Sequence, residues 1–197
     1  MMHKKVLPIV LFGLIPFLGC TNPLEPQHGD YHIHADFKVV LDEKVMDFNK
    51  ARHMSTPYKE LSERTHLHDF NPYVIHIHSK DITLGEFFAT LGMDLNEDCF
   101  FDGAQNYCNG SWKTLQSYVN GKQNNQFGSY KPSDLDKILV YYGAGKPSEE
   151  LLGSLTNWAC VYSEKCAAPE GFVMPPESCT ASKPCTIYDL PAAGGDN

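Results

Sequence analysis

Six of the nine histidines occur as three His-x-His pairs, a spacing that has a direct chemical meaning on a β-strand. Successive side chains of a strand point to opposite faces, so both imidazoles of a pair project from one face and the intervening residue projects from the other. Neighbouring strands lie about 4.8 Å apart, which would bring imidazoles of adjacent strands within reach of one cation. The pairs are His32 with His34, His66 with His68, and His76 with His78.

The chemistry that such a cluster predicts is the binding of a divalent transition metal. Neutral imidazole suits Cu(II) and Zn(II), whereas Cu(I) prefers thioether and thiolate ligands, and the methionines after residue 20 form no tight motif. Asp36 follows His34 on the same strand face, and we expect it to act as a further ligand or as the acceptor that fixes an imidazole tautomer. Whether the six histidines hold one ion or two stays open.

Two other interpretations of the histidines are possible. They could form a polar strand face of a surface domain that binds no metal, although three pairs in a chain with nine histidines favour the metal. An enzyme is the less favoured reading, because the chain has no His-Glu-x-x-His motif and is too short for a barrel of about 250 residues. His28 and His53 lie in polar segments, and we expect both at the surface.

The residues around the pairs predict the elements that position them. Residues 31–41 alternate as a strand that returns as a hairpin over residues 45–48. The second and third pairs are separated by turn-forming residues, which predicts two antiparallel strands. Leu84 to Gly92 has helical apolar spacing, with Thr83 and Glu86 as a capping box and Gly92 as the stop.

The later part of the chain completes a compact domain over residues 31–145. Asn120-Gly121 predicts a second hairpin, and residues 134–142 read as another strand. The fold class is therefore α+β, with an antiparallel or mixed sheet packed on one main helix, in an order that looks like a β-grasp arrangement. Residues 146–197 form a tail rich in cysteine and proline, which we expect to bury little and to depend on disulfides.

The amino terminus predicts export. Lys4 and Lys5 precede an apolar run that is too short to span a membrane comfortably and that ends at Gly19-Cys20. This pattern is typical of a lipoprotein-type signal peptide over residues 1–19, with Cys20 lipidated and residues 20–30 as a tether. The protein would then be anchored to the outer face of a cell-envelope membrane. Ordinary secretion, with Cys20 discarded or free, is the alternative.

The remaining cysteines and the charge agree with an exported protein. An even number of cysteines outside the cytoplasm predicts disulfides, and the gaps of five and eight residues miss the spacing of thiolate zinc sites. The formal charge of −8, more negative still without Lys4 and Lys5, disfavours nucleic acid and attracts cations. No sequence feature indicates a protein partner. Short gaps favour the pairs Cys99 with Cys108, Cys160 with Cys166, and Cys179 with Cys185, other pairings remaining open.

Residues 30–185 resemble a family of small exported prokaryotic proteins that are often labelled protein-disulfide isomerase. The label implies a thiol-disulfide oxidoreductase, which we keep as the alternative function. Redox catalysis of that kind uses Cys-x-x-Cys with a lowered thiol pKa, and this chain has no such pair. The resemblance is carried by the three His-x-His segments, Thr83-Leu84-Gly85-Glu86-Phe87-Phe88, Tyr118-Val119-Asn120-Gly121-Lys122, Asp134-Leu135-Asp136-Lys137-Ile138-Leu139 and the segment 159–166.

Overall fold

The structure is a computed structural model that describes residues 31–56, 59–68 and 71–172. The strands are β1 (Ile33–Leu41), β2 (Lys44–Val45), β3 (Thr65–His66), β4 (Val74–Ile77), β5 (Asp94–Leu95), β6 (Cys99–Phe101), β7 (Asn106–Cys108), β8 (Thr114–Val119), β9 (Lys122–Gln123) and β10 (Lys137–Gly143). The helices are α1 (Leu84–Thr90), α2 (Glu149–Gly153) and α3 (Trp158–Tyr162), with short 3-10 turns η1 (Ala51–His53) and η2 (Phe127–Ser129).

Strand β1 lies at the centre of a seven-stranded mixed sheet with the order β3-β4-β1-β10-β8-β9, in which β2 also pairs with β1. It runs parallel to β10 and antiparallel to β4. Asp42 and Glu43 connect β1 to β2 with φ angles of 52° and 65°, the left-handed conformation that a two-residue hairpin turn requires. The predicted hairpin is therefore confirmed, although its second strand spans Lys44–Val45 instead of residues 45–48.

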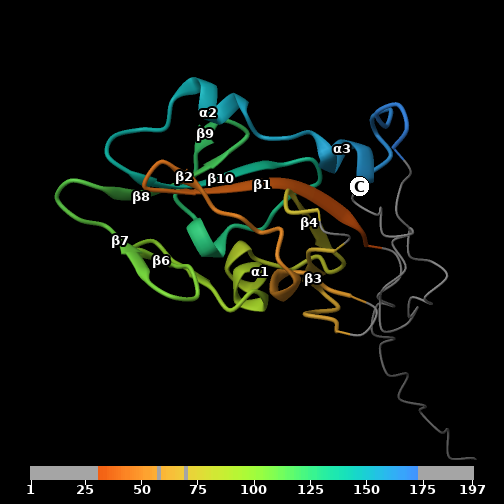
Figure 1. Ribbon diagram of the computed structural model, residues 1–197, viewed down its shortest axis with the longest axis horizontal. Helices are drawn as coiled ribbons and strands as arrows, with labels where there is room; N and C mark the ends of the chain where they lie inside the picture. Colours follow the sequence, from red (N-terminus) through yellow and green to blue (C-terminus); the bar gives the residue numbers. More distant parts are fainter. Residues whose placement is uncertain (1–30, 57–58, 69–70, 173–197) are drawn as a thin grey trace, which may run out of the picture.

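Strand β4, beside β1, and strand β3, beside β4, bring the histidine pairs together. Strands β3 and β4 are antiparallel, with His66 opposite His76, and β4 in turn places His76 opposite His34 on β1. The predicted antiparallel pairing of the second and third His-x-His segments is confirmed. The first pair, which is distant in the sequence from the other two, thus joins them at one end of the sheet (Figure 1).

Helix α1 covers one face of the sheet (Figure 1). Thr83 and Glu86 form the predicted capping box, and Gly92, at a φ of 73°, follows the end of the helix. Phe87 and Phe88 are fully buried against the apolar residues of β1, and each such ring contributes roughly 1.5–3 kcal/mol by leaving water. This larger core makes the sheet a rigid support for the histidines.

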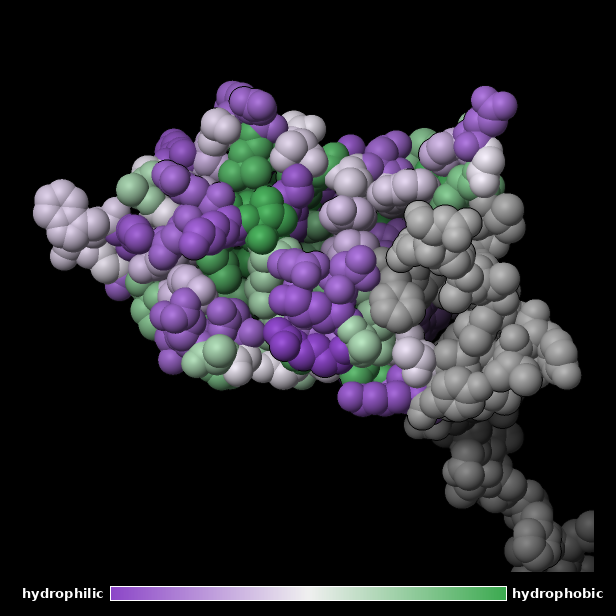
Figure 2. Space-filling model, in the orientation of Figure 1, coloured by the Kyte–Doolittle hydropathy of each residue, from purple (hydrophilic) through white to green (hydrophobic). Residues whose placement is uncertain are grey.

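The opposite face of the sheet carries α2 and α3 (Figure 1). Leu155, on the segment between them, packs into a second core with Val40 and Tyr141, and Figure 2 shows apolar side chains beneath α2 on a largely hydrophilic surface. Ala159 and Tyr162 of α3 are also buried. The expectation that the chain after residue 145 buries little is therefore wrong for residues 155–162, because the second face of the sheet needs a cover.

The disulfides agree with the predictions wherever the structure describes the cysteines. Cys99 pairs with Cys108 across β6 and β7 of a separate three-stranded sheet. Cys160 pairs with Cys166 at the end of α3. Two disulfides indicate an oxidising compartment and so an exported protein. Cys20, Cys179 and Cys185 lie outside the described residues.

The mixed α+β class is confirmed, with the addition of the small sheet and of the two helices on the second face. The β-grasp arrangement stays a prediction. Among the described helices, none is long and apolar enough to cross a membrane. The predicted signal peptide and tether, residues 1–19 and 20–30, lie outside the described residues.

Candidate metal centre

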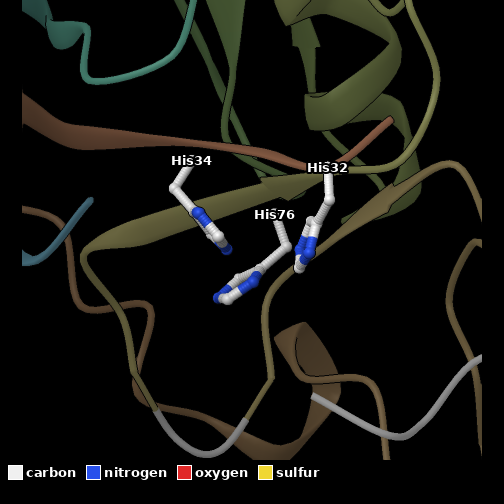
Figure 3. Close-up of side chains that lie close together, drawn as sticks. All are labelled: His32, His34 and His76. Atoms are coloured by element: carbon white, nitrogen blue, oxygen red, sulfur yellow. The ribbon is translucent and has the colours of Figure 1, made fainter. Parts of the chain in front are cut away.

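Three histidines form a compact group at the end of β1 and β4. His32 immediately precedes β1, His34 lies in β1 and His76 lies in β4. Each offers one ring nitrogen, and the three nitrogens are within 4.8 Å of one another. Figure 3 shows the three rings converging on the same space from the two strands. Strand pleating places His32 and His34 on one face, and the antiparallel register adds His76 to it.

Burial differs sharply among the three. His34 and His76 retain only 2% and 0% of their surface exposed, whereas His32 is exposed. The group is therefore held rigidly on two sides and open to solvent on the third. The interpretation of the histidines as a solvated polar face is incompatible with the burial of His34 and His76.

The other three histidines adjoin this group. The ring of His68 lies 3.8 Å from that of His76, and the ring of His78 lies 4.4 Å from that of His32, between centroids. His66 is 5.1 Å from His78 by the same measure. All six rings therefore form one cluster, although only His32, His34 and His76 are arranged as a ligand group within the described residues.

The orientation of His34 is set by a residue from α3's end. Nδ1 of His34 lies 2.8 Å from Oγ of Ser163, and the Ser163 hydroxyl donates to a carboxylate oxygen of Asp134 at 2.7 Å. The same Asp134 oxygen accepts the backbone N–H of His34 at 3.1 Å. Burial raises the pKa of Asp134, but hydrogen bonds from Lys165 and Ser163 outweigh it, so the pKa is lower than usual and the group is a carboxylate.

Two further hydrogen bonds orient rings in the cluster. Nδ1 of His66 lies 2.6 Å from the carbonyl oxygen of Ser62, and because a carbonyl can only accept, that nitrogen carries the proton. Nε2 of His68 lies 3.0 Å from Nδ1 of His76, so one of these two rings donates to the other. When His76 is the donor, its Nε2 carries a lone pair, the form needed by a metal ligand.

Burial keeps the centre of the cluster neutral. Desolvation and, next, the neighbouring rings of His68 and His34 hold the pKa of His76 well below its usual value. Desolvation and then the ring of His32 lower the pKa of His78 to about 3. Metal ions compete with protons for the imidazole nitrogens. Rings that are already neutral at physiological pH therefore do not have to release a proton before they coordinate an ion.

Asp36 has a different role from the one that the sequence suggested. Its carboxylate accepts hydrogen bonds from the backbone N–H groups of Trp158 at 2.9 Å and Ala159 at 3.1 Å, and from the Thr156 hydroxyl. Both oxygens therefore cap the first turn of α3. The prediction that Asp36 is a metal ligand or the partner of an imidazole is corrected, because helix α3 packs on the strand face that carries Asp36 and engages its carboxylate.

Tyr162 of α3 completes the wall of the cluster. Its ring lies 5.1 Å from that of His76, edge to face, and 5.7 Å from that of His34. The hydroxyl of Tyr162 accepts a hydrogen bond of 3.2 Å from the side-chain amide of Asn71. Tyr162 and Ser163 thus form one side of the candidate centre.

His53 was expected at the surface, and that expectation is wrong. It retains 1% of its surface exposed, packs against Phe48, and Nε2 accepts a hydrogen bond of 2.9 Å from Arg52. Its surroundings are those of a structural histidine in the core under β1. His28 lies outside the described residues.

Sequence reasoning missed Ser163 and Tyr162. Both are separated from His34 by more than 100 residues, and neither lies in a spacing that indicates chemistry. The only local signal was the short Cys160 to Cys166 interval, which predicted a constrained segment but not its position on the sheet.

In comparisons with protein-family models, curated proteins and solved structures, nothing matched this chain.

Proposed function

We propose that this protein binds a divalent transition metal ion through His32, His34 and His76. The observation that carries the proposal is the convergence of three ring nitrogens within 4.8 Å. Three nitrogens that bind one ion tetrahedrally at about 2.1 Å lie about 3.4 Å apart, so side-chain rotations that shorten the present separations by roughly 1–1.5 Å would close the site. His34 and His76 are already held by packing, and the exposed His32 supplies the adjustable ligand.

The donor atoms favour Zn(II) or Cu(II). Imidazole suits both ions, and the cysteines that the structure describes are paired in disulfides, so they supply no thiolate. The described methionines belong to the core on the α1 side of the sheet, away from the histidine face: Met54 and Met93 are buried in it, and Met46 is partly buried against it. A Cu(I) site of thioether type therefore has no support from these residues.

The biological role that fits such a site is capture, buffering or transfer of the metal outside the cytoplasm. Three protein ligands leave a coordination position open, and the exposure of His32 puts that position next to solvent. Within this proposal the chain is exported and anchored through a lipid on Cys20. Mass spectrometry of protein from a membrane fraction would detect the lipid on Cys20.

A thiol-disulfide oxidoreductase is the alternative that the family resemblance suggests. No observation among the described residues favours it over metal binding. Cys99 and Cys108 lie nine positions apart and Cys160 and Cys166 lie six positions apart, unlike a Cys-x-x-Cys pair at the start of a helix. Insulin reduction by the purified protein would support this alternative.

The test of metal binding uses the chain purified without a histidine tag and stripped with a chelator. We expect titration with Zn(II) or Cu(II), followed by calorimetry and elemental analysis, to give at least one tightly bound ion per chain. His76→Ala should weaken binding at least tenfold, because it removes the ligand at the centre of the cluster.

The matched control is His53→Gln. His53 is as buried as His76 but lies outside the cluster, so this variant should lose stability and keep its metal. The proposed function is wrong if the wild-type chain binds neither ion, or if both variants bind the metal as tightly as the wild type does.

A further inference from the structure

The strongest unassigned feature next to the candidate centre is the chain of hydrogen bonds from His34 to Ser163 and Asp134. It joins β1 to a residue just before β10 and to a residue just after α3, over sequence separations of 100 and 129 residues. Ser163 is a single hydroxyl between an imidazole and a carboxylate. This arrangement restricts where each proton can be.

The first restriction comes from Asp134. One carboxylate oxygen faces Lys165, with which it forms an ion pair, and the other faces the Ser163 hydroxyl and the His34 backbone N–H. A carboxylate can only accept hydrogen bonds, so the proton of Ser163 must point toward Asp134.

The second restriction follows for His34. A hydroxyl has one proton, and that of Ser163 is committed to Asp134, so Oγ can only accept from Nδ1 of His34 at 2.8 Å. Nδ1 must therefore carry the proton of the neutral imidazole. The lone pair then belongs to Nε2, on the side of the ring that Figure 3 shows facing His76.

We infer that Ser163 is a positioning residue that fixes His34 as the Nδ1–H tautomer and so presents Nε2 to the metal. The inference rests on the proposed function for the metal itself, but the tautomer can be measured without one. Residues that hold the other ring nitrogen of a metal-bound histidine do not touch the metal themselves. Their mutation typically lowers metal affinity by about 10- to 100-fold. Ser163 and Asp134 fill the role that the sequence had suggested for Asp36.

The first measurement is the tautomer of His34 in the metal-free protein, read from its ring nitrogen shifts in long-range proton–nitrogen NMR spectra at pH 8. We expect a single Nδ1–H form in the wild type. Ser163→Ala should give a mixture of both tautomers, and Ser163→Thr, which restores a hydroxyl, should return the single form. An unchanged tautomer in Ser163→Ala would overturn the inference.

The second measurement is Zn(II) affinity of the same proteins. Ser163→Ala should bind about tenfold more weakly, and Ser163→Thr should recover most of the loss. Ser129→Ala is the matched control, because Ser129 donates to the Gln126 carbonyl on the other side of the molecule and should leave affinity unchanged.

The two proposals fail in different ways. A wild-type protein without Zn(II) binding overturns the proposed function, while the tautomer in the metal-free protein still decides the role of Ser163. If the wild-type protein binds Zn(II) but Ser163→Ala and Ser163→Thr have equal affinities, the role of Ser163 is overturned and the proposed function is not. A circular dichroism spectrum that matches wild type shows that the variants are folded.

Discussion

His34 and His76 are directly opposite each other in the antiparallel ladder between β1 and β4, and their rings meet edge to face with centroids 4.7 Å apart. Both are almost completely buried, and α3 covers them. Two buried imidazoles on neighbouring strands, held from behind by a serine and a tyrosine, form a rigid half of the proposed metal site. The exposed His32 is the half that can move.

Acid should destabilise the metal-free protein. His76 and His78 have pKa values below the usual 6.5, so above about pH 6.5 both are neutral in the folded and unfolded chains and their contribution to stability is complete. As the pH falls toward 3, the unfolded chain takes up protons that the folded chain does not, and this contribution is lost. Urea unfolding should give a free energy lower by roughly 1–2 kcal/mol at pH 5 than at pH 7.5.

The control for this pH effect is His78→Gln, in which one of the depressed groups no longer titrates. Its stability should fall less steeply over the same range. Equal stability of the wild type at pH 7.5 and pH 5 would contradict burial of these rings as neutral imidazoles.

Asp36→Ala should act through α3 rather than through the metal directly. Loss of the carboxylate removes the hydrogen bonds to Trp158 and Ala159, which should cost about 2 kcal/mol in urea unfolding. Zn(II) affinity should fall far less than in His34→Ala. An equal loss of affinity in the two variants would restore Asp36 as a ligand.

Ser148→Ala is the matched cap variant. Ser148 caps α2 through the backbone N–H of Leu151 and lies away from the histidines, so its loss should cost about 1 kcal/mol and leave Zn(II) affinity unchanged.

The disulfide between Cys160 and Cys166 should matter for the metal. It closes the segment that holds Tyr162 and Ser163 against the histidines, so replacing both cysteines by serine should weaken Zn(II) binding by about tenfold, as for the loss of Ser163 itself. Calorimetry measures the change. The double serine variant of Cys99 and Cys108 is the control, because that disulfide lies in the other sheet and should affect stability only. Equal Zn(II) affinities in both double variants would show that the Cys160–Cys166 disulfide does not contribute to metal binding.

Thr83→Ala should destabilise the domain without touching the site. It removes both hydrogen bonds of the Thr83 hydroxyl in the capping box of α1, on the face of the sheet opposite the histidines, at a cost of about 1 kcal/mol. Urea unfolding should show this loss, and Zn(II) titration should give the wild-type affinity. A parallel loss of affinity would mean that the two faces of the sheet are coupled.

Several features were determined by the sequence alone, because they depend on local geometry. Alternation along a strand put His32 and His34 on one face, short cysteine gaps identified two disulfides, and Thr83 with Glu86 marked the start of α1. Each of these signals links residues fewer than ten positions apart, where backbone period or loop length leaves few alternatives.

The tertiary structure alone decided what covers the histidines. The parallel pairing of β1 with β10 brings Asp134 beside His34. The packing of α3 on the same face brings Ser163 and Tyr162 to the site and engages the Asp36 carboxylate in hydrogen bonds to the start of the helix. No local spacing encodes contacts across more than 100 residues, since they arise only when the second face of the sheet must be shielded from water. The sequence therefore determined which side chains could bind a metal, and the packing of the chain decided which of them are held in position to do so.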